Sequence, residues 1–268
     1  MQFDFGAAVL SETQVRLGVF AGVFIIMAVV EALWPRKNRT QPRITRWFTN
    51  LGMVVVDSLA VRIIFPIVAV GLAQYATARG WGLLNMIALP FWLQVLISAV
   101  LMDMAIYWQH VASHKIPVLW RVHRVHHADR DIDVSTGNRF HPIEIVLSML
   151  YKFVVILLLG PAALGVFLFE VLLNGSAMFN HANVALPQWL DKLLRLLFVT
   201  PDMHRIHHSW HRDETDSNYG FNLAIWDKIF GTYIDQPRDG HKEMVIGVKK
   251  FQDDKPSNII WSLLLPFK

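Results

Sequence analysis

Residues 90–115 read PFWLQVLISAVLMDMAIYWQHVASHK and decide the fold. The run from Pro90 to Trp108 is apolar except for Asp103. A helix needs roughly 20 apolar residues to cross about 30 Å of hydrocarbon, and this run is close to that length. Just beyond it, His110 and His114 stand four positions apart, which places them on one face of a helix. The stretch therefore predicts a membrane span that ends in a pair of imidazoles.

Two further apolar runs precede this span. Leu17 to Trp34 contains one acid, Glu31, and Leu51 to Ala73 is interrupted by Asp57 and Arg62, whose pairing the sequence leaves open. Over the chain of 268 residues, 54% are hydrophobic and 17% are charged, and the mean hydropathy is +0.36. This composition is too apolar for an ordinary soluble enzyme. We therefore expect an all-α, polytopic helical membrane protein.

The basic residues predict the orientation in the membrane. The formal net charge is +4, but the basic residues cluster between apolar runs instead of forming the face that nucleic acid would need. Residues 36–46 hold five basic residues and no acid, whereas the loop from Gln74 to Leu89 carries only Arg79. Basic loops face the cytoplasm. We expect residues 36–46 and the segment from Gln109 to Arg139 on that side, and no nucleic-acid partner.

The N-terminus and the last long apolar stretch complete the membrane prediction. The N-terminus has no basic start or small-residue cleavage site, so the first apolar run is expected to be retained. Ile145 to Leu173 breaks at Gly160-Pro161 and would be about 44 Å long as a helix, which is short for two crossings. One crossing would separate the two histidine-rich regions. We interpret the stretch as a shallow helical hairpin that turns at Gly160-Pro161.

Two later segments are predicted to lie along the membrane interface. PQWLDKLLRLLF, from Pro187 to Phe198, is amphipathic, and the tail contains IIWSLLLPF. The chain also has no cysteine, which excludes disulfides, iron–sulfur clusters, thiolate zinc sites and a cysteine nucleophile. Any metal must therefore be held by nitrogen and oxygen ligands, and any electrons must come from a separate donor.

The histidines fall into regular motifs. Three motifs hold eight of the twelve histidines: His110 and His114; His123, His126 and His127; His204, His207 and His208. Offsets of three and four place each set on one helix face. Neutral imidazole suits iron, zinc, copper and nickel. One such pair could arise by chance at a membrane edge, but eight nitrogens in three motifs favour two metal ions with open coordination positions.

The remaining histidines differ in their settings. His181 lies in F-N-H-A-N, just after the hairpin, and is expected to be a further ligand. His141, in R-F-H-P-I-E, and His211, three positions after His208, are possible additional metal ligands. His211 is more simply read as a neighbour of the site. His241 lies in a charged tail, and we expect it at the surface.

Asp103 is the tentative catalytic residue. Asp103, Tyr107, His110 and His114 recur along a single helical stripe. A carboxylate within a span is costly and is usually functional. We therefore expect Asp103 to orient a ligand ring from behind the metal site. The alternative is a structural hydrogen bond to another helix.

Other chemistries are excluded by missing motifs. The sequence contains no H-E-x-x-H, no glutamate three residues before a histidine, no phosphate-binding loop and no G-x-S-x-G. A zinc protease of the first type, the carboxylate-rich di-iron site of soluble bundles and a serine hydrolase elbow are therefore not indicated. No sequence signal for another bound organic cofactor is present.

Taken together, these motifs resemble the fatty acid hydroxylase/sterol desaturase superfamily. The resemblance rests on D-x-x-x-Y-W-x-H-x-x-x-H from Asp103, W-R-V-H-R-V-H-H from Trp120 and R-F-H-P-I-E from Arg139, followed by N-H-A-N-V, H-R-I-H-H-S and N-Y-G-F-N-L-A-I-W-D-K-I-F-G-T-Y. It covers roughly residues 95 to 235 in order and is highly specific. The first ninety residues are similar only in being helical and apolar.

The resemblance implies a helical membrane domain with a cytosolic histidine-rich cap and a site for two irons, which zinc could replace in purified protein. The histidines of the three motifs and His181 match family ligands. O₂ would be the co-substrate, and a separate donor of the cytochrome b5, ferredoxin or reductase type would supply electrons. The expected reaction is hydroxylation or desaturation of a C–H bond in a lipid: a sterol, fatty acyl chain, sphingolipid, ether lipid or carotenoid.

These expectations divide the chain into three regions. Residues 1–90 form an N-terminal transmembrane region, residues 91–240 a catalytic domain with a helical hairpin at 143–176, and residues 241–268 a tail that could associate with the membrane. The alternative functions are a membrane metal transporter and a di-zinc membrane hydrolase. A transporter should place its ligands within the spans. A hydrolase would need a carboxylate base, for which Glu144 or Glu214 could serve.

Overall fold

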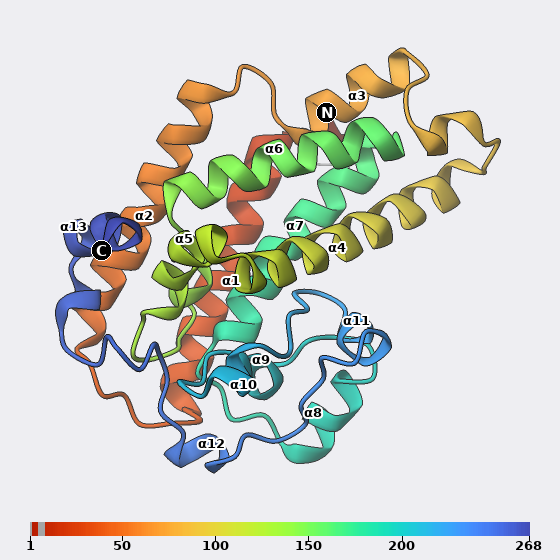
Figure 1. Ribbon diagram of the computed structural model, residues 1–268. Coiled ribbons are helices and arrows are strands. Elements are labelled where there is room, and N and C mark those ends of the chain that lie inside the picture. Colours follow the sequence, from red (N-terminus) through yellow and green to blue (C-terminus); the bar gives the residue numbers. More distant parts are fainter. Residues whose placement is uncertain (1, 5–8) are drawn as a thin grey trace.

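Long helices dominate the computed structural model, which describes residues 2–4 and 9–268 (Figure 1). The five longest are α1 (Glu12–Leu33), α2 (Arg43–Ile64), α4 (Phe91–Lys115), α6 (Pro142–Leu159) and α7 (Ala163–His181). The strands formed by the described residues are β1 (Gln2–Asp4) and β2 (Val9–Ser11), which pair antiparallel just before α1. Ser11 caps α1 in a reciprocal capping box with Gln14.

Five segments of the described chain are long and apolar enough to cross a membrane. They are Glu12–Leu33, Arg43–Met86, Phe91–Lys115, Pro142–Leu159 and Ala163–His181. Large apolar side chains stand exposed along them, such as Ile26 on α1, Ile63 on α2 and Trp92 on α4. Lipid tails can cover such surface, and a helix satisfies its own backbone hydrogen bonds within the bilayer. The expected all-α, polytopic membrane fold is confirmed.

The second span differs from its prediction as one continuous helix over 51–73. α2 ends at Ile64, and the separate helix α3 (Ala69–Ala78) follows Pro66. Proline lacks an N–H and its ring crowds the preceding turn, so the helix breaks there. The predicted loop from Gln74 therefore begins as the end of α3, and it also contains the short 3₁₀ helix η1 (Leu83–Met86).

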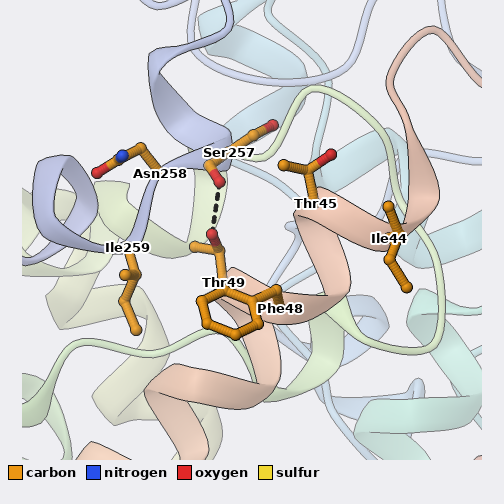
Figure 2. A pocket seen from close by; sticks show the side chains of 7 residues that line it. All are labelled: Ile44, Thr45, Phe48, Thr49, Ser257, Asn258 and Ile259. Carbon is orange, nitrogen blue, oxygen red and sulfur yellow. Dashed lines mark hydrogen bonds between the residues drawn. The ribbon is translucent and has the colours of Figure 1, made fainter.

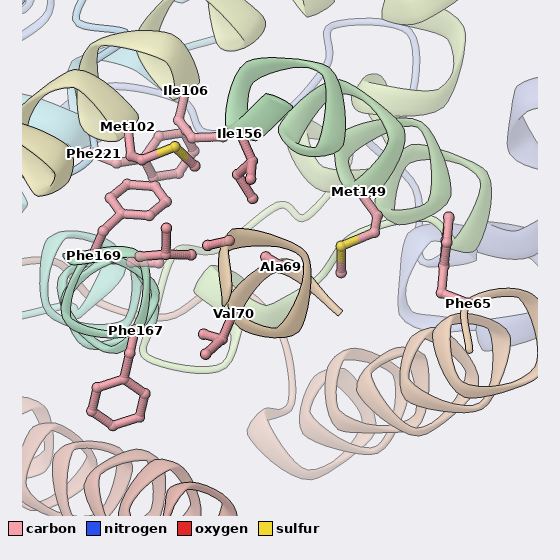
Figure 3. Packing of buried hydrophobic residues seen from close by; sticks show 13 residues of the cluster. Phe65, Ala69, Val70, Met102, Ile106, Met149, Ile156, Phe167, Phe169 and Phe221 are labelled. Carbon is pink, nitrogen blue, oxygen red and sulfur yellow. The ribbon is translucent and has the colours of Figure 1, made fainter. Parts of the chain in front are cut away.

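The break places α3 in the apolar core of the bundle. Ala69 and Val70 of α3 are buried together with Met102 of α4, Ile156 of α6 and Phe169 of α7 (Figure 3). Small residues on α3 let its backbone approach the neighbouring helices closely, which is how helices pack within a membrane. The core therefore fixes α4 and α7, which carry histidines at their ends.

The helices α6 and α7 lie on either side of Gly160, where the turn of the hairpin is predicted. Gly160 has a left-handed backbone (φ 61°), and an added Cβ would lie 2.4 Å from the carbonyl oxygen of Trp81, so glycine is required there. The two helices extend beyond the apolar stretch at both ends. α6 has 18 residues and α7 has 19, which is about 27–28 Å each at 1.5 Å per residue. How deeply the hairpin enters the bilayer stays a prediction.

Short helices form a cap around one end of the long helices (Figure 1). Those that precede or follow the hairpin closely are α5 (Pro117–His127), η2 (Thr136–Asn138), α8 (Gln188–Leu194) and α9 (Pro201–His207). The later ones are α10 (Arg212–Thr215), α11 (Ile225–Ile229), α12 (Gly240–Glu243), η3 (Lys255–Ser257), α13 (Ile259–Leu264) and η4 (Leu265–Phe267).

Helix α8 turns its polar face inward. The buried carboxylate of Asp191 accepts a hydrogen bond from the Thr200 hydroxyl (2.6 Å), whereas Trp189 is 68% and Leu193 56% exposed. Likewise in the tail, Ser262 of α13 is buried while Ile260 is exposed. An apolar face turned outward is what a helix at the membrane interface presents. The interfacial position of both segments stays a prediction.

A surface hollow of about 370 Å³ separates the start of α2 from η3 and α13 (Figure 2). Its lining is mostly apolar and contains none of the histidines: Ile44, Thr45, Phe48, Thr49, Ser257, Asn258 and Ile259. The Thr49 hydroxyl donates to the carbonyl of Ser257 (2.5 Å) across it. The tail is therefore joined to α2 and is not a free extension.

Buried charged side chains join the first two long helices to the cap, through ion pairs from α2 and backbone hydrogen bonds to α1. The guanidinium of Arg46 on α2 donates to Asp129 (2.7 and 2.8 Å) and to Asp133 (2.5 Å). The carboxylate of Glu31 on α1 accepts from the backbone N–H of Val134 (3.0 Å) and that of Asn183 (3.2 Å). Within the described residues, no ion pair joins Asp57 to Arg62.

Candidate metal centre

Four helices bring the histidines together at the junction of the bundle and the cap. α4 carries His110 and His114 near its end, and α7 ends at His181. The cap helix α5 carries His123, His126 and His127; α9 carries His204 and His207, with His208 directly after it. Each of these nine side chains is at most 3% exposed. The single stripe predicted along α4 is present, since Asp103 and Tyr107 are buried on it too.

The nine histidines form two groups whose nitrogen atoms lie within 4.8 Å of one another. The five-histidine group consists of His110, His114, His123, His127 and His207. The four-histidine group consists of His126, His181, His204 and His208. Helix α5 and the α9 segment contribute to both groups. In each H-x-x-H-H motif the two histidines four positions apart fall in one group and the middle histidine falls in the other, so the expected single face of three ligands is not observed. The structure thus gathers the nine predicted ligands into two places.

Five of the rings are oriented by hydrogen bonds that their Nδ1 atoms donate. His110, His207, His126 and His181 donate to the carbonyls of Tyr219 (2.7 Å), Ser217 (2.7 Å), Arg139 (3.2 Å) and Ala177 (2.6 Å). His123 donates to the Glu144 carboxylate (2.6 Å). Carbonyl and carboxylate oxygens only accept, so Nδ1 carries the proton in each ring. The other nitrogen, Nε2, therefore presents a lone pair to the centre of its group.

The Nε2 lone pairs within each group face one another, and their separation indicates whether the group can hold a metal ion. The Nε2 atoms of His110 and His123 lie 3.1 Å apart in the five-histidine group, as do those of His126 and His181 in the four-histidine group. Two lone pairs at this distance repel unless a cation lies beside them. Burial, followed by the neighbouring imidazoles, holds the pKa of His126 well below its ordinary value, so a proton is a poor candidate. The donor set fits a metal ion such as iron or zinc.

Glu144 is a functional residue that the sequence reasoning did not place correctly. It was considered only as the base of a hydrolase, yet its carboxylate accepts from His123. Its position in the first turn of α6, two residues after Pro142, aims it back at α5. A carboxylate behind a ligating imidazole fixes the tautomer and raises the basicity of the ring. The signal was available in R-F-H-P-I-E, three residues after His141.

A shaped loop holds two rings of the five-histidine group. Asn218 adopts a left-handed backbone (φ 48°), and its side-chain amide donates to the carbonyl of Met203 (2.9 Å). Asp227 accepts from the backbone N–H of Tyr219 (2.7 Å) and that of Gly220 (2.8 Å). The loop is therefore fixed from both sides, and it aims its carbonyls at His110 and His207. In the motif N-Y-G-F-N-L-A-I-W-D, the first residue, Asn218, and the last, Asp227, thus hold the loop in place.

Asp103 does not have the contact expected of it. Its carboxylate accepts from the Asn222 amide (2.8 Å), the Leu223 N–H (3.3 Å) and the Trp226 indole (2.8 Å), and it bonds none of the histidines in the described chain. It fastens α4 to the segment after the 217–221 loop. The prediction that it orients a ligand ring directly is wrong, because the carbonyl of Tyr219 occupies that position at His110.

Three histidines lie outside both groups. His141 caps α6 by accepting from the N–H of Ile143 (3.2 Å), and it contacts the carbonyl of Leu263 through its other nitrogen (3.1 Å). His211 lies 2.8 Å from Asp239 and belongs to neither group, which agrees with the interpretation that it is a neighbour of the site. His241 was expected at the surface, but it is buried 3.7 Å from Asp202. The chain folds back over α9 there, and burial lowers the pKa of His241 to about 4.

The fold and the site define an integral membrane protein with a buried centre of imidazoles. The model of the fatty acid hydroxylase family matches residues 95–232, about half of the chain and all of the histidines of both groups. The chain belongs to this family. No solved structure matches it.

Several curated relatives are named as hydroxylases or monooxygenases. Ornithine lipid hydroxylase OlsE of Rhizobium tropici is 29% identical over 85% of this chain and 70% of its own length. Human alkylglycerol monooxygenase is 34% identical over 49% of this chain, but only 28% of that protein is covered. Methylsterol monooxygenase 2-2 of Arabidopsis thaliana is 29% identical over 60% of this chain and 61% of its own length. The chain is accordingly a membrane oxidoreductase of the oxygenase type.

Proposed function

We propose that this protein is a membrane lipid oxygenase that hydroxylates or desaturates a C–H bond, with two iron ions, O₂ and electrons from a separate donor. One observation carries the proposal. In each group two Nε2 lone pairs face each other at 3.1 Å, and a metal ion bound in each group would relieve the repulsion between them. The family match and the relatives support the class of reaction.

The two groups would hold the two ions. The rings of His110, His114, His123, His127 and His207 would ligate one, and those of His126, His181, His204 and His208 the other. When bound, iron supplies the activation of O₂ that cleavage of an unactivated C–H bond requires. The chain's own contribution is to orient the rings through their Nδ1 hydrogen bonds and to keep water out, since every ring is buried.

The location of the site suits a substrate that arrives from the bilayer. The ligands lie at the ends of α4 and α7 and in the cap, where the apolar helices meet polar surface. A lipid can keep its polar part at this boundary while its chain approaches from the hydrocarbon. The named relatives act on an ornithine lipid, alkylglycerol and methylsterol, so the substrate class of this chain is a membrane lipid with a long chain or sterol body.

The two alternative functions have less support. A transporter should line a path through its spans with ligands, whereas these histidines gather at span ends and in the cap. A di-zinc hydrolase needs a carboxylate free to act as a base. Glu144 accepts from His123, and Glu214 accepts from the backbone N–H of Arg238 (2.5 Å). One oxygen of each carboxylate is thus engaged, and neither side chain belongs to the two histidine groups.

The orientation of the cap is part of the proposal. We expect the histidines on the cytoplasmic side and η1 on the opposite side, as the basic loop at 36–46 indicates. In this cysteine-free chain, cysteine at the exposed Asp253 should resist an impermeant thiol reagent in intact cells, whereas cysteine at the exposed Met86 should react. Reaction of the first and protection of the second would reverse the orientation.

Lipid mass spectrometry tests the reaction itself. Cells that produce the wild-type protein should accumulate a lipid that has gained one oxygen or lost two hydrogens. Cells that produce His207→Ala, with equal amounts of protein in the membrane, should not. A wild-type protein that carries metal but alters no lipid under aerobic, reducing conditions would contradict the proposal and favour a metal-binding role without oxidation.

A further inference from the structure

Tyr219 lies against the five-histidine group with its backbone fixed on both sides. Its N–H donates to Asp227 (2.7 Å), and its carbonyl accepts from His110 Nδ1 (2.7 Å). The side chain is fully buried. Its ring centroid lies 5.1 Å from that of His114, 5.5 Å from that of His110 and 5.6 Å from that of His207. The phenol ring is therefore part of the wall around this group.

The hydroxyl of Tyr219 has no hydrogen-bond partner among the described residues. The neighbouring Tyr107 differs, since its hydroxyl pairs with that of Thr232 (2.8 Å). A buried hydroxyl without a partner costs about 1–3 kcal/mol, so proteins rarely keep one that nothing will satisfy. A donor held rigidly at the wall of a proposed metal site is suited to a small ligand that enters the site.

We propose that the Tyr219 hydroxyl donates a hydrogen bond to the small exogenous ligand that binds at the five-histidine group, which is O₂ during the reaction. The proposal rests on the proposed function and adds a catalytic residue to it. The four-histidine group has no tyrosine among its ring contacts in the described chain, so the small ligand is recognised on one side only. No proton or electron has to leave the phenol for this role.

Azide provides a probe that does not depend on turnover. Iron-loaded wild-type protein should bind azide, whereas metal-free protein should not. Tyr219→Phe removes only the hydroxyl, so its metal content should stay at the wild-type value. Its unfolding temperature should not fall, because the lost hydroxyl has no hydrogen-bond partner among the described residues. Its dissociation constant for azide should rise roughly three- to tenfold, the usual worth of one hydrogen bond. The infrared stretching frequency of bound azide should shift in the same variant.

Tyr107→Phe is the matched control because it removes a hydroxyl that Thr232 already satisfies. Its azide affinity and azide frequency should equal those of the wild type. Equal affinity and frequency in Tyr219→Phe would overturn the proposal, and so would a loss of metal in that variant, which would make Tyr219 a support of the site. If Tyr219→Phe lowers affinity for the lipid but not for azide, the hydroxyl serves the substrate. Wild-type protein that binds no metal would instead end the proposed function.

Discussion

The two histidine groups differ in what stands behind their rings. In the five-histidine group, His123 donates to the carboxylate of Glu144, and Nδ1 of His114 lies 3.4 Å from a carboxylate oxygen of Asp216. In the four-histidine group, His126 and His181 donate to neutral oxygens: the carbonyl of Arg139, and the carbonyl of Ala177 together with the side-chain oxygen of Asn180. Helix α5 and the α9 segment supply rings to both groups.

This difference makes the two proposed metal positions unequal. A carboxylate behind an imidazole strengthens its donation to a metal more than a neutral carbonyl does. The five-histidine group is also lined by Tyr219. By contrast, the buried carboxylate of Asp129, which pairs with Arg46, favours positive charge at His181 of the four-histidine group. The first group is therefore suited to bind the exchangeable ligand, and the second to hold an ion in a fixed frame.

Removing a ring should have the largest effect and test both groups. His207→Ala takes the middle member of the α9 motif from the five-histidine group, and His126→Ala takes the middle member of the α5 motif from the four-histidine group. Each should lower metal content and abolish lipid oxidation together, because a ligand is lost. Metal analysis and lipid mass spectrometry measure the two quantities. Continued lipid oxidation by His207→Ala would show that the five-histidine group is not needed for the reaction.

Removing the buried ion support should destabilise the four-histidine side. Arg46→Met leaves Asp129 and Asp133 without their cation inside the protein. Breaking a buried ion pair costs about 3–5 kcal/mol, so the variant should unfold at a clearly lower temperature in detergent. Arg130→Met is the control, since Arg130 pairs with the exposed Asp254 and such a pair is worth about 0–1 kcal/mol. Equal unfolding temperatures for the two variants would show that the buried network adds no stability.

Neutralising Glu144 should weaken the five-histidine group alone. Glu144→Gln keeps the size of the side chain but removes the charge behind His123. Loss of such a partner usually lowers metal affinity or activity roughly 10–100-fold. Metal titration should show one weakened and one unchanged binding step. Glu243→Gln, on the surface of α12, should leave both steps unchanged. Two equally weakened steps would mean that the groups are not independent.

Asp103→Asn should have a smaller effect than Glu144→Gln. Asp103 holds the segment at Asn222, Leu223 and Trp226 and reaches His110 only through the 217–221 loop. An amide in its place can still accept one of these hydrogen bonds. Metal affinity should therefore fall by less than the roughly tenfold lower limit for a direct partner. A loss as large as that of Glu144→Gln would show that the loop transmits the whole effect.

The sequence predicted the candidate histidine ligands better than it predicted the groups that accept hydrogen bonds from them. Spacing by three and four places singled out eight of the nine histidines, because helix geometry makes that spacing visible, and His181 was expected from its position after the hairpin. Ser217 and Tyr219 act through backbone carbonyls, which no residue letter announces. Similarly, the inward turn of His241 depends on where the tail folds over α9, a contact between distant segments.

The apolar pattern likewise predicted spans but not every break in them. It identified the break at Gly160 between α6 and α7, because a glycine and a proline interrupt an otherwise uniform run. The prediction of one continuous span over 51–73 misses the same signal at Pro66, because the residues on both sides are as apolar as those of a continuous span. Hydropathy reports what a segment can be buried in, whereas proline reports where its helix must end.

His241 provides a predicted effect that is confined to acidic pH, on a buried histidine that belongs to neither group. Burial lowers its pKa to about 4, and Arg205, Arg36 and Arg195 act in the same direction against the attraction of Asp202. The unfolded chain, with an ordinary pKa near 6.5, therefore takes up the proton first as the pH falls. The stability that neutral His241 permits is complete above about pH 6.5 and is lost between there and pH 4.

His241→Gln should therefore unfold like the wild type at pH 7.5, with unchanged metal content. Between pH 6.5 and pH 4 the variant should gain on the wild type by at most about 1.4 kcal/mol per pH unit, because only the wild type has this proton to bind on unfolding. Unfolding measured as a function of pH in the metal-free state of both proteins isolates the term. Parallel curves would mean that His241 keeps its ordinary pKa despite its burial. A loss of metal at neutral pH would mean that the nine-histidine site extends to a tenth residue behind α9.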